Sequence, residues 1–145
     1  MIIVDSGPLV SALNRAEGRR HRFAVELLRA SAPHVIVPWP VYTEVDLLLR
    51  SRGHAKAATA FGAALLDGVH ALEQPSGEEL AHAITILERY ADLGLDLPDA
   101  VTIAMAARRR AWAWTWDYRH FRVVMVEHGQ GLPLLVAEDE LPPVE

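Results

Sequence analysis

The sequence predicts an α/β domain built around a mainly parallel sheet. Short apolar runs alternate with longer segments in which apolar residues recur every three or four positions, as expected of strands joined by helices. The first run, residues 1–4, is apolar throughout, which is typical of a strand buried on both faces. The chain has 145 residues, of which 51% are hydrophobic, so we expect one domain over residues 1–145.

Proline residues mark helix boundaries in the first half of the chain. Pro8 and Pro40 suit the first turn of a helix, because their missing N–H group would have no helical partner there. Pro33 ends a segment in which Phe23, Leu27 and Ala30 are spaced as on one helical face. In order, we expect a strand at 1–4, helices at 8–14 and 19–30, a strand at 34–37 and a helix from 39.

The second half continues the alternation. Ser76 and Glu79 form a capping-box pattern that predicts the start of a helix. Residues 111–116 alternate small or polar side chains with tryptophan, which is a strand signal. The expected elements are helices at 55–66, 76–90 and from 98, and strands at 69–72, 111–116 and, at an edge, 132–136. We expect residues 138–145, which are acidic and rich in proline, to form a flexible tail.

Composition excludes several classes of protein. Cysteine is absent, so there are no disulfides or zinc–thiolate sites, which fits a reducing cytoplasmic location. No apolar run approaches the roughly 20 residues of a membrane-spanning helix. The net charge of −5 owes much to the acidic tail, and all basic residues but Lys56 are arginines. Clustered arginines permit RNA binding, although solvated helix ends explain them equally well.

Four acidic residues occupy positions where α/β proteins present functional groups. Asp5 follows the first strand and Asp117 follows the strand at 111–115, while Glu44 and Asp99 lie near the starts of helices that begin with proline. Ligands bind at the carboxyl ends of parallel strands, so we expect these side chains to converge there. Their mutual repulsion would oppose folding unless a divalent cation were bound. The sequence therefore predicts a magnesium-type nuclease, and Mn²⁺ would also suit the oxygen ligands.

Each acid also has a purely structural explanation. Asp5, Asp99 and Asp117 lie where a carboxylate can cap a helix or favour its N-terminal dipole, and Glu44, in the first turn of its helix, also gains from the dipole. Asp92 and Asp96 compete with Asp99 as the third ligand, and we favour Asp99 because a helix holds a side chain more rigidly than a loop.

Other chemistries have little support. The histidines form no metal-binding pair of the HxxH or HxxxH kind, no GxxxxGK phosphate loop is present, and nothing around Ser6 indicates a serine hydrolase. Trp112, Trp114 and Trp116 could stack on bases, but we expect core or dimer packing instead. His120 lies three residues after Asp117, within reach of the metal site or the RNA.

The chain resembles the PIN-domain family, in particular VapC-type toxin ribonucleases. The resemblance rests on four segments in the same order, 2–9, 38–44, 90–100 and 115–121, which read IIVDSGPL, PWPVYTE, YADLGLDLPDA and TWDYRHF. It covers the chain from Met1 to about Val124. It implies a PIN-like three-layer α/β/α fold with a central parallel sheet of four to five strands.

The resemblance also implies a function. The chain would be a Mg²⁺-dependent endoribonuclease toxin of a type II toxin–antitoxin pair, a homodimer blocked by a VapB-type antitoxin, with structured RNA such as tRNA among its substrates. Ser6, Thr115, Asp96 and His120 would support the metal-binding residues, which would be Asp5, Glu44, Asp99 and Asp117. His120 departs from the family, which often has an aspartate there. Two alternatives stay open: a PIN-type nuclease outside any toxin pair, and a catalytically silent dimeric binding module.

Overall fold

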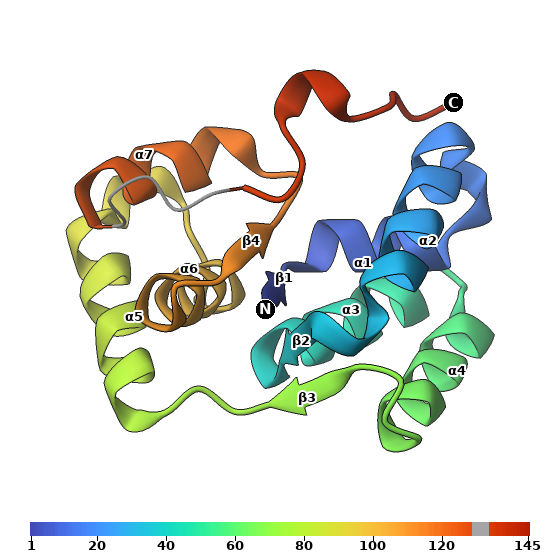
Figure 1. Ribbon diagram of the computed structural model, residues 1–145, viewed down its shortest axis with the longest axis horizontal. Coiled ribbons are helices and arrows are strands. Elements are labelled where there is room, and N and C mark those ends of the chain that lie inside the picture. The colour runs from blue at the N-terminus through green and yellow to red at the C-terminus, as the bar shows by residue number, and fades with distance from the viewer. Residues whose placement is uncertain (129–133) are drawn as a thin grey trace.

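In residues 1–128 and 134–145, which the computed structural model describes, four parallel strands form one sheet between two layers of helices (Figure 1). The strands are β1 (Ile2–Val4), β2 (Val35–Pro38), β3 (Ala71–Glu73) and β4 (Trp112–Trp114). The helices are α1 (Ser6–Leu13), α2 (Arg19–Ser31), α3 (Trp39–Ser51), α4 (Ala55–Leu66), α5 (Gly77–Arg89), α6 (Leu97–Arg109) and α7 (Tyr118–His128). Single 3₁₀ turns lie at Arg15–Glu17, Ala32–His34, Ala91–Leu93 and Glu138–Glu140. The expected three-layer α/β/α fold with a parallel sheet is confirmed.

The strand order is β3-β2-β1-β4, so β1 lies between β2 and β4. Ile3 is paired with Ile36 on one side and with Ala113 on the other. The chain moves outward from β1 to β2 and β3, and then returns to place β4 on the opposite side of β1. The direction of winding therefore switches at β1, and in open α/β sheets ligands bind at such a switch point.

Side chains of β1 alternate between two apolar cores. Ile3 packs with residues of α5, α6 and α7, whereas Ile2 and Val4 pack with residues of α1, α3 and α4. Figure 1 shows these two groups of helices on opposite sides of the sheet. Because both faces of β1 are covered, every position of this short strand is buried, and this explains why its sequence is a continuous apolar run.

Strand boundaries differ from the expected ones for local reasons. β4 is shorter than the predicted 111–116, because the hydroxyl of Thr115 bonds to Asp5 and accepts the backbone N–H of Asp117. β3 begins later than the predicted 69–72. The predicted edge strand at 132–136 lies partly outside the described residues, and Leu134 forms a single parallel bridge with Ala113.

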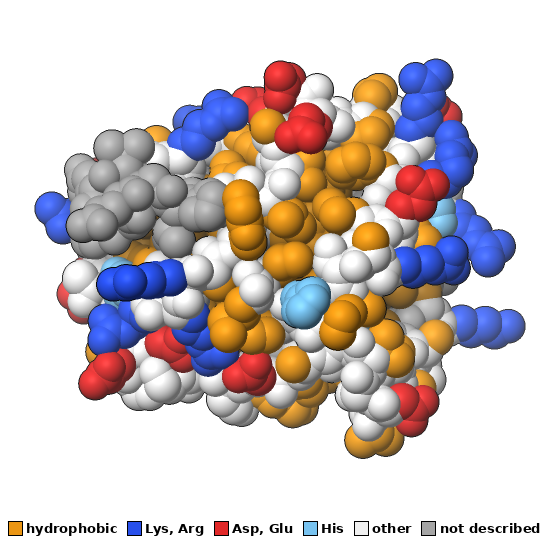
Figure 2. Space-filling model, in the orientation of Figure 1, with side chains coloured by type: hydrophobic (Ala, Val, Ile, Leu, Met, Phe, Trp, Pro, Cys, Tyr) orange, Lys and Arg blue, Asp and Glu red, His pale blue; other side chains and the backbone are white. Residues whose placement is uncertain are grey.

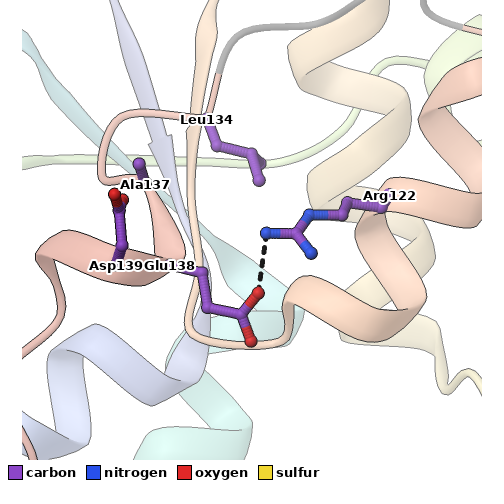
Figure 3. Close-up of a pocket in the computed structure, with 5 residues that line it drawn as sticks. All are labelled: Arg122, Leu134, Ala137, Glu138 and Asp139. Carbon is purple, nitrogen blue, oxygen red and sulfur yellow. Dashed lines mark ion pairs between the residues drawn. The ribbon is translucent and has the colours of Figure 1, made fainter.

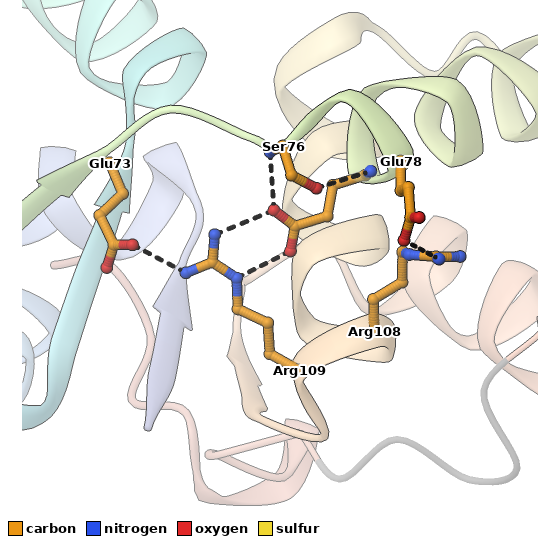
Figure 4. A network of polar contacts seen from close by, with 6 residues as sticks. Glu73, Ser76, Glu78, Arg108 and Arg109 are labelled. Atoms are coloured by element: carbon orange, nitrogen blue, oxygen red, sulfur yellow. Dashed lines mark hydrogen bonds and ion pairs between the residues drawn. The ribbon is translucent and has the colours of Figure 1, made fainter.

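Arg109 ties α6 to α5 and β3 (Figure 4). Its guanidinium donates to both carboxylate oxygens of Glu79, at 2.7 and 2.9 Å, and to Glu73 at 2.9 Å. Glu79 also completes the predicted capping box with Ser76. Arg108 donates to Glu78 at 2.8 Å. These two arginines, which the sequence made candidates for RNA binding, are therefore engaged within the protein.

Residues 138–145 lie across α2 and α7, with contacts to three arginines that are described further below. The flexibility expected of this segment stays a prediction. No helix in the described ranges is long and apolar enough to cross a membrane.

Candidate metal-binding site

The fold brings together carboxylates from four separate segments at the carboxyl ends of β1 and β4. Asp5 directly follows β1, and its backbone N–H donates to the carbonyl of Trp114 at 2.8 Å, so the ends of the two strands are adjacent. The negative charges interact: those of Asp117 and Asp96 add to burial in raising the pKa of Asp5.

Asp5 is the most buried of these acids. Its residue is 3% exposed, and burial raises its pKa from 3.8 to about 6, against the opposing effect of the Thr115 hydroxyl. Oδ2 accepts the Thr115 hydroxyl at 2.7 Å, whereas Oδ1 is buried without a hydrogen-bond partner. Asp5 precedes α1 in the N-cap position, but its side chain makes no capping bond. Helix capping therefore does not explain this residue.

Thr115 connects Asp5 to Asp117. Its hydroxyl donates to Asp5 and accepts the N–H of Asp117 at 2.9 Å, and the residue is 1% exposed. Residue 115 therefore holds the two acids in a fixed relation, although they are more than a hundred positions apart in the sequence. The supporting role of Thr115 at a metal site stays a prediction.

Asp99 is both a helix-capping residue and a member of the acidic group. Its N–H donates to Asp96 Oδ1 at 3.1 Å, and its Oδ2 accepts the N–H of Asp96 at 3.3 Å, which completes a capping box at the start of α6. Burial raises the pKa of Asp99 from 3.8 to about 8, and the charges of Asp5 and Asp96 act in the same direction. Asp92 is exposed in the preceding 3₁₀ turn. Of the competing acids, Asp96 therefore lies with Asp99.

Glu44 approaches the same group from α3. It is half-buried, and burial raises its pKa from 4.5 to about 7. The Ser6 side chain opposes this rise, while Asp96 and Asp5 reinforce it. Glu44 and Ser6 are therefore close enough to influence each other, as expected for a supporting Ser6.

Asp117 is engaged mainly by His120. Its Oδ2 lies 2.8 Å from Nδ1 of His120, and its Oδ1 accepts the N–H of the same residue at 3.2 Å. The preceding Trp116 is anchored separately, because its Nε1 donates to Ser11 Oγ at 2.9 Å and that hydroxyl donates to Glu17 at 2.6 Å. No sequence pattern predicts these hydrogen bonds, because the tryptophan and serine are 105 positions apart.

The carboxylates of the acidic group are suitable ligands for a hard divalent cation, but they do not form a complete coordination site. Within the described residues, no three Asp, Glu or His side chains are arranged so that they could hold a metal ion as they stand. The unpartnered oxygen of Asp5 and the raised pKa values of Asp5, Glu44 and Asp99 nevertheless show that negative charge is under-compensated here. A cation would relieve this, and Asp99 and Asp117 would exchange their present hydrogen bonds for it.

A three-layer α/β/α fold with carboxylates gathered at the switch point defines the class of acidic, nuclease-like α/β domains. Within that class, the chain belongs to the PIN-domain family, because the family model of the PIN domain matches residues 2–124. The match includes every segment that supplies an acid to the site.

Individual relatives carry the comparison further. Ribonuclease VapC26 of Mycobacterium tuberculosis is 29% identical over 121 residues, which are 83% of this chain and 89% of the relative. The crystal structure of Mycobacterium tuberculosis VapC20, a toxin that cleaves the sarcin-ricin loop, matches with a TM-score of 0.73 and 25% identity over 85% of this chain and 94% of that one. A toxin–antitoxin complex from Klebsiella pneumoniae shares the fold, with a TM-score of 0.62 and 21% identity over 83% of this chain and 90% of its own. The expected resemblance to PIN domains and VapC-type ribonucleases is confirmed.

Proposed function

We propose that this chain is a VapC-like endoribonuclease toxin of a type II toxin–antitoxin system and that it depends on Mg²⁺ or Mn²⁺. The observation that carries the proposal is the group of carboxylates with raised pKa values around the unpartnered oxygen of Asp5, at the switch point of a PIN domain. In this proposal the metal-binding residues are Asp5, Glu44, Asp99 and Asp117.

When bound there, the cation supplies an activated water and stabilises charge on the phosphate oxygens of RNA. The side chains of the protein prepare for this. Thr115 holds Asp5 so that Oδ2 is occupied and Oδ1 is left for a ligand. Glu44 adds a carboxylate from α3, and a bound cation would lower its pKa, which burial and the neighbouring acids raise in the metal-free protein. Ser6 and Asp96 adjust the charge of Glu44, and His120 holds the Asp117 carboxylate by a contact of 2.8 Å.

The substrate and partners are proposed from the relatives. One solved relative is a toxin that cleaves an RNA loop, and another forms a toxin–antitoxin complex. We therefore propose structured RNA, with tRNA among the candidates, as the substrate, and a VapB-type protein as the antitoxin. The homodimer and the cytoplasmic location implied by the family belong to the same proposal.

Purified protein incubated with RNA tests this function. Wild-type protein should produce defined RNA ends with Mg²⁺ or Mn²⁺ and none with a chelator, whereas Asp5→Asn and Asp99→Asn should produce none under any condition. Asp67→Asn, at the exposed end of α4, is the matched control and should cleave like the wild type. Sequencing the ends identifies the target, and growth arrest on expression that Asp5→Asn relieves would link cleavage to toxicity.

Two outcomes would point elsewhere. Cleavage without growth arrest would favour a PIN nuclease outside a toxin pair. Absence of both cleavage and Mg²⁺ binding would refute the nuclease and leave the silent binding module. The latter has one observation in its favour, since Asp99 and Asp117 already have hydrogen-bond partners at the starts of their own helices.

A further inference from the structure

We infer that the acidic segment, residues 138–145, occupies the surface that binds the RNA backbone beside Asp117, and that RNA displaces it. The inference deepens the proposed function and rests on it. The acidic segment lies beyond residues 2–124, the part of the chain that matches the PIN-domain model.

The acidic segment places oxygen atoms on three arginines. Glu138 forms an ion pair with Arg122 at 2.7 Å, and the carbonyl of Pro142 accepts from Arg20 Nε at 2.8 Å. Glu145 forms an ion pair with Arg19. Guanidinium groups bind phosphate oxygens with the same donors. The segment therefore presents to these arginines the kind of acceptor that an RNA backbone would present.

A cavity lies under one of these contacts (Figure 3). Its volume is about 600 Å³, and it is lined by Arg122, Leu134, Ala137, Glu138 and Asp139. Figure 3 shows the Arg122 guanidinium pointing across the cavity at the Glu138 carboxylate. The contact between the segment and α7 therefore lies beside a cavity.

Tyr118 places this surface next to the acidic site. It directly follows Asp117, is 5% exposed, and its hydroxyl is buried without a hydrogen-bond partner. Arg122 lies over its ring, 5.6 Å from the centroid. Arg122 therefore contacts both the acidic segment, through Glu138, and the residue that follows Asp117. Displacement of the segment would free the guanidinium of Arg122 beside Tyr118, one residue from a proposed metal ligand.

The contacts of the acidic segment are weak enough to be exchanged. The side chains of Arg122 and Glu138 are 57% and 58% exposed, and those of Arg19 and Glu145 are 66% and 43% exposed. Exposed ion pairs contribute little to stability, and a polyanion competes for them effectively. Figure 2 shows basic side chains along the edge over α2, with acidic side chains where the 3₁₀ turn of the segment lies.

Arg109 provides the contrast. Its partner Glu79 is almost completely buried and binds it through two oxygens. If RNA bound the Arg109 guanidinium in place of Glu79, the buried carboxylate would lose its counter-charge, which is energetically unfavourable. Of these two arginine groups, only the one under the acidic segment is available to RNA.

RNA binding without divalent metal tests the inference independently of cleavage. In a chelator, the affinity for a fluorescein-labelled RNA hairpin is measured by anisotropy for the wild type and for Glu138→Gln/Glu145→Gln. Freeing two exposed ion pairs should raise the affinity about tenfold. The control Asp67→Asn/Glu88→Gln changes the net charge equally at exposed positions, one at the end of α4 and one on α5, and should raise the affinity much less.

A second pair of variants tests the arginines. Arg20→Gln/Arg122→Gln should lower RNA affinity about tenfold or more, whereas Arg52→Gln/Lys56→Gln, which removes two exposed cations elsewhere, should lower it far less. Circular dichroism establishes that each variant is folded.

Equal affinities of Glu138→Gln/Glu145→Gln and its control would overturn the inference, even if the wild type cleaves RNA. The expected rise in affinity without any cleavage by the wild type would refute the nuclease and leave the binding surface standing.

Discussion

Asp5→Asn should make the stability of the metal-free protein less dependent on pH. The pKa of Asp5 is raised from 3.8 to about 6 in the folded protein. The folded state therefore holds this proton more tightly than the unfolded state, and stability falls as pH rises through that range. The difference between the two pKa values corresponds to about 3 kcal/mol at neutral pH.

Asparagine cannot ionise, so the variant lacks this loss. Its carbonyl oxygen can still accept the Thr115 hydroxyl, and any constant cost of the buried amide is the same at all pH values. The difference in free energy of unfolding, variant minus wild type, should therefore increase by about 2.4 kcal/mol between about pH 4 and about pH 7, because part of the loss has already occurred at pH 4. Relief of the repulsion between Asp5 and Asp99 adds to the increase.

Urea unfolding with a chelator, followed by tryptophan fluorescence at several pH values, measures this difference. Asp67→Asn is the control, because its side chain is exposed at the end of α4, and its unfolding should follow the pH dependence of the wild type. A difference between Asp5→Asn and wild type that does not change with pH would refute the reasoning, since it would mean that burial imposes no penalty on the carboxylate.

Three further outcomes are expected. Arg109→Leu should destabilise the protein by about 3 to 5 kcal/mol in urea unfolding, because it leaves Glu79 buried and unpaired. Arg109 lowers the pKa of Glu79, so the stability that the pair contributes is present above the ordinary pKa of glutamate and is lost as pH falls through the folded value. The loss of stability in Arg109→Leu should therefore become smaller in acid. A loss of stability independent of pH would contradict this explanation. Thr115→Val should raise the pKa of Asp5 further and weaken Mg²⁺ binding at neutral pH about tenfold by calorimetry, and unchanged binding would contradict the supporting role of Thr115. Removal of divalent cations should lower the melting temperature of the wild type but not of Asp5→Asn, and equal shifts would place the bound ion elsewhere.

The fold and the positions of the acids were predictable because they depend on local patterns. A continuous apolar run identified β1, and a parallel strand directs the residue after it to one edge of the sheet, which located Asp5 and the neighbourhood of Asp117. Pro98 and the capping positions around it located Asp99 at a helix start. The sequence could not decide whether Asp99 caps its helix or joins the acidic group, and the structure places it in both situations.

Contacts between distant residues were not predictable from these patterns. Arg109 meets Glu79 across 30 positions, and Arg20 meets Pro142 across 122. Both arginines look alike in the sequence, as members of short basic runs at the ends of helix α6 or α2. Arg109 meets a buried carboxylate, whereas Arg20 meets the backbone carbonyl of a half-buried proline. This difference separates a structural arginine from one that is available to a ligand, and it depends on the complete fold.

The capping box of α6 has a consequence for how the protein would sense ions. A cation held by both carboxylate oxygens of Asp99 would compete with the N–H of Asp96 for the lone pairs of Oδ2. Binding of such an ion would therefore weaken the capping of the first turn of α6, and the backbone N–H of Asp96 would exchange faster with solvent. The order of the first turn of α6 would then depend on the concentration of the ion.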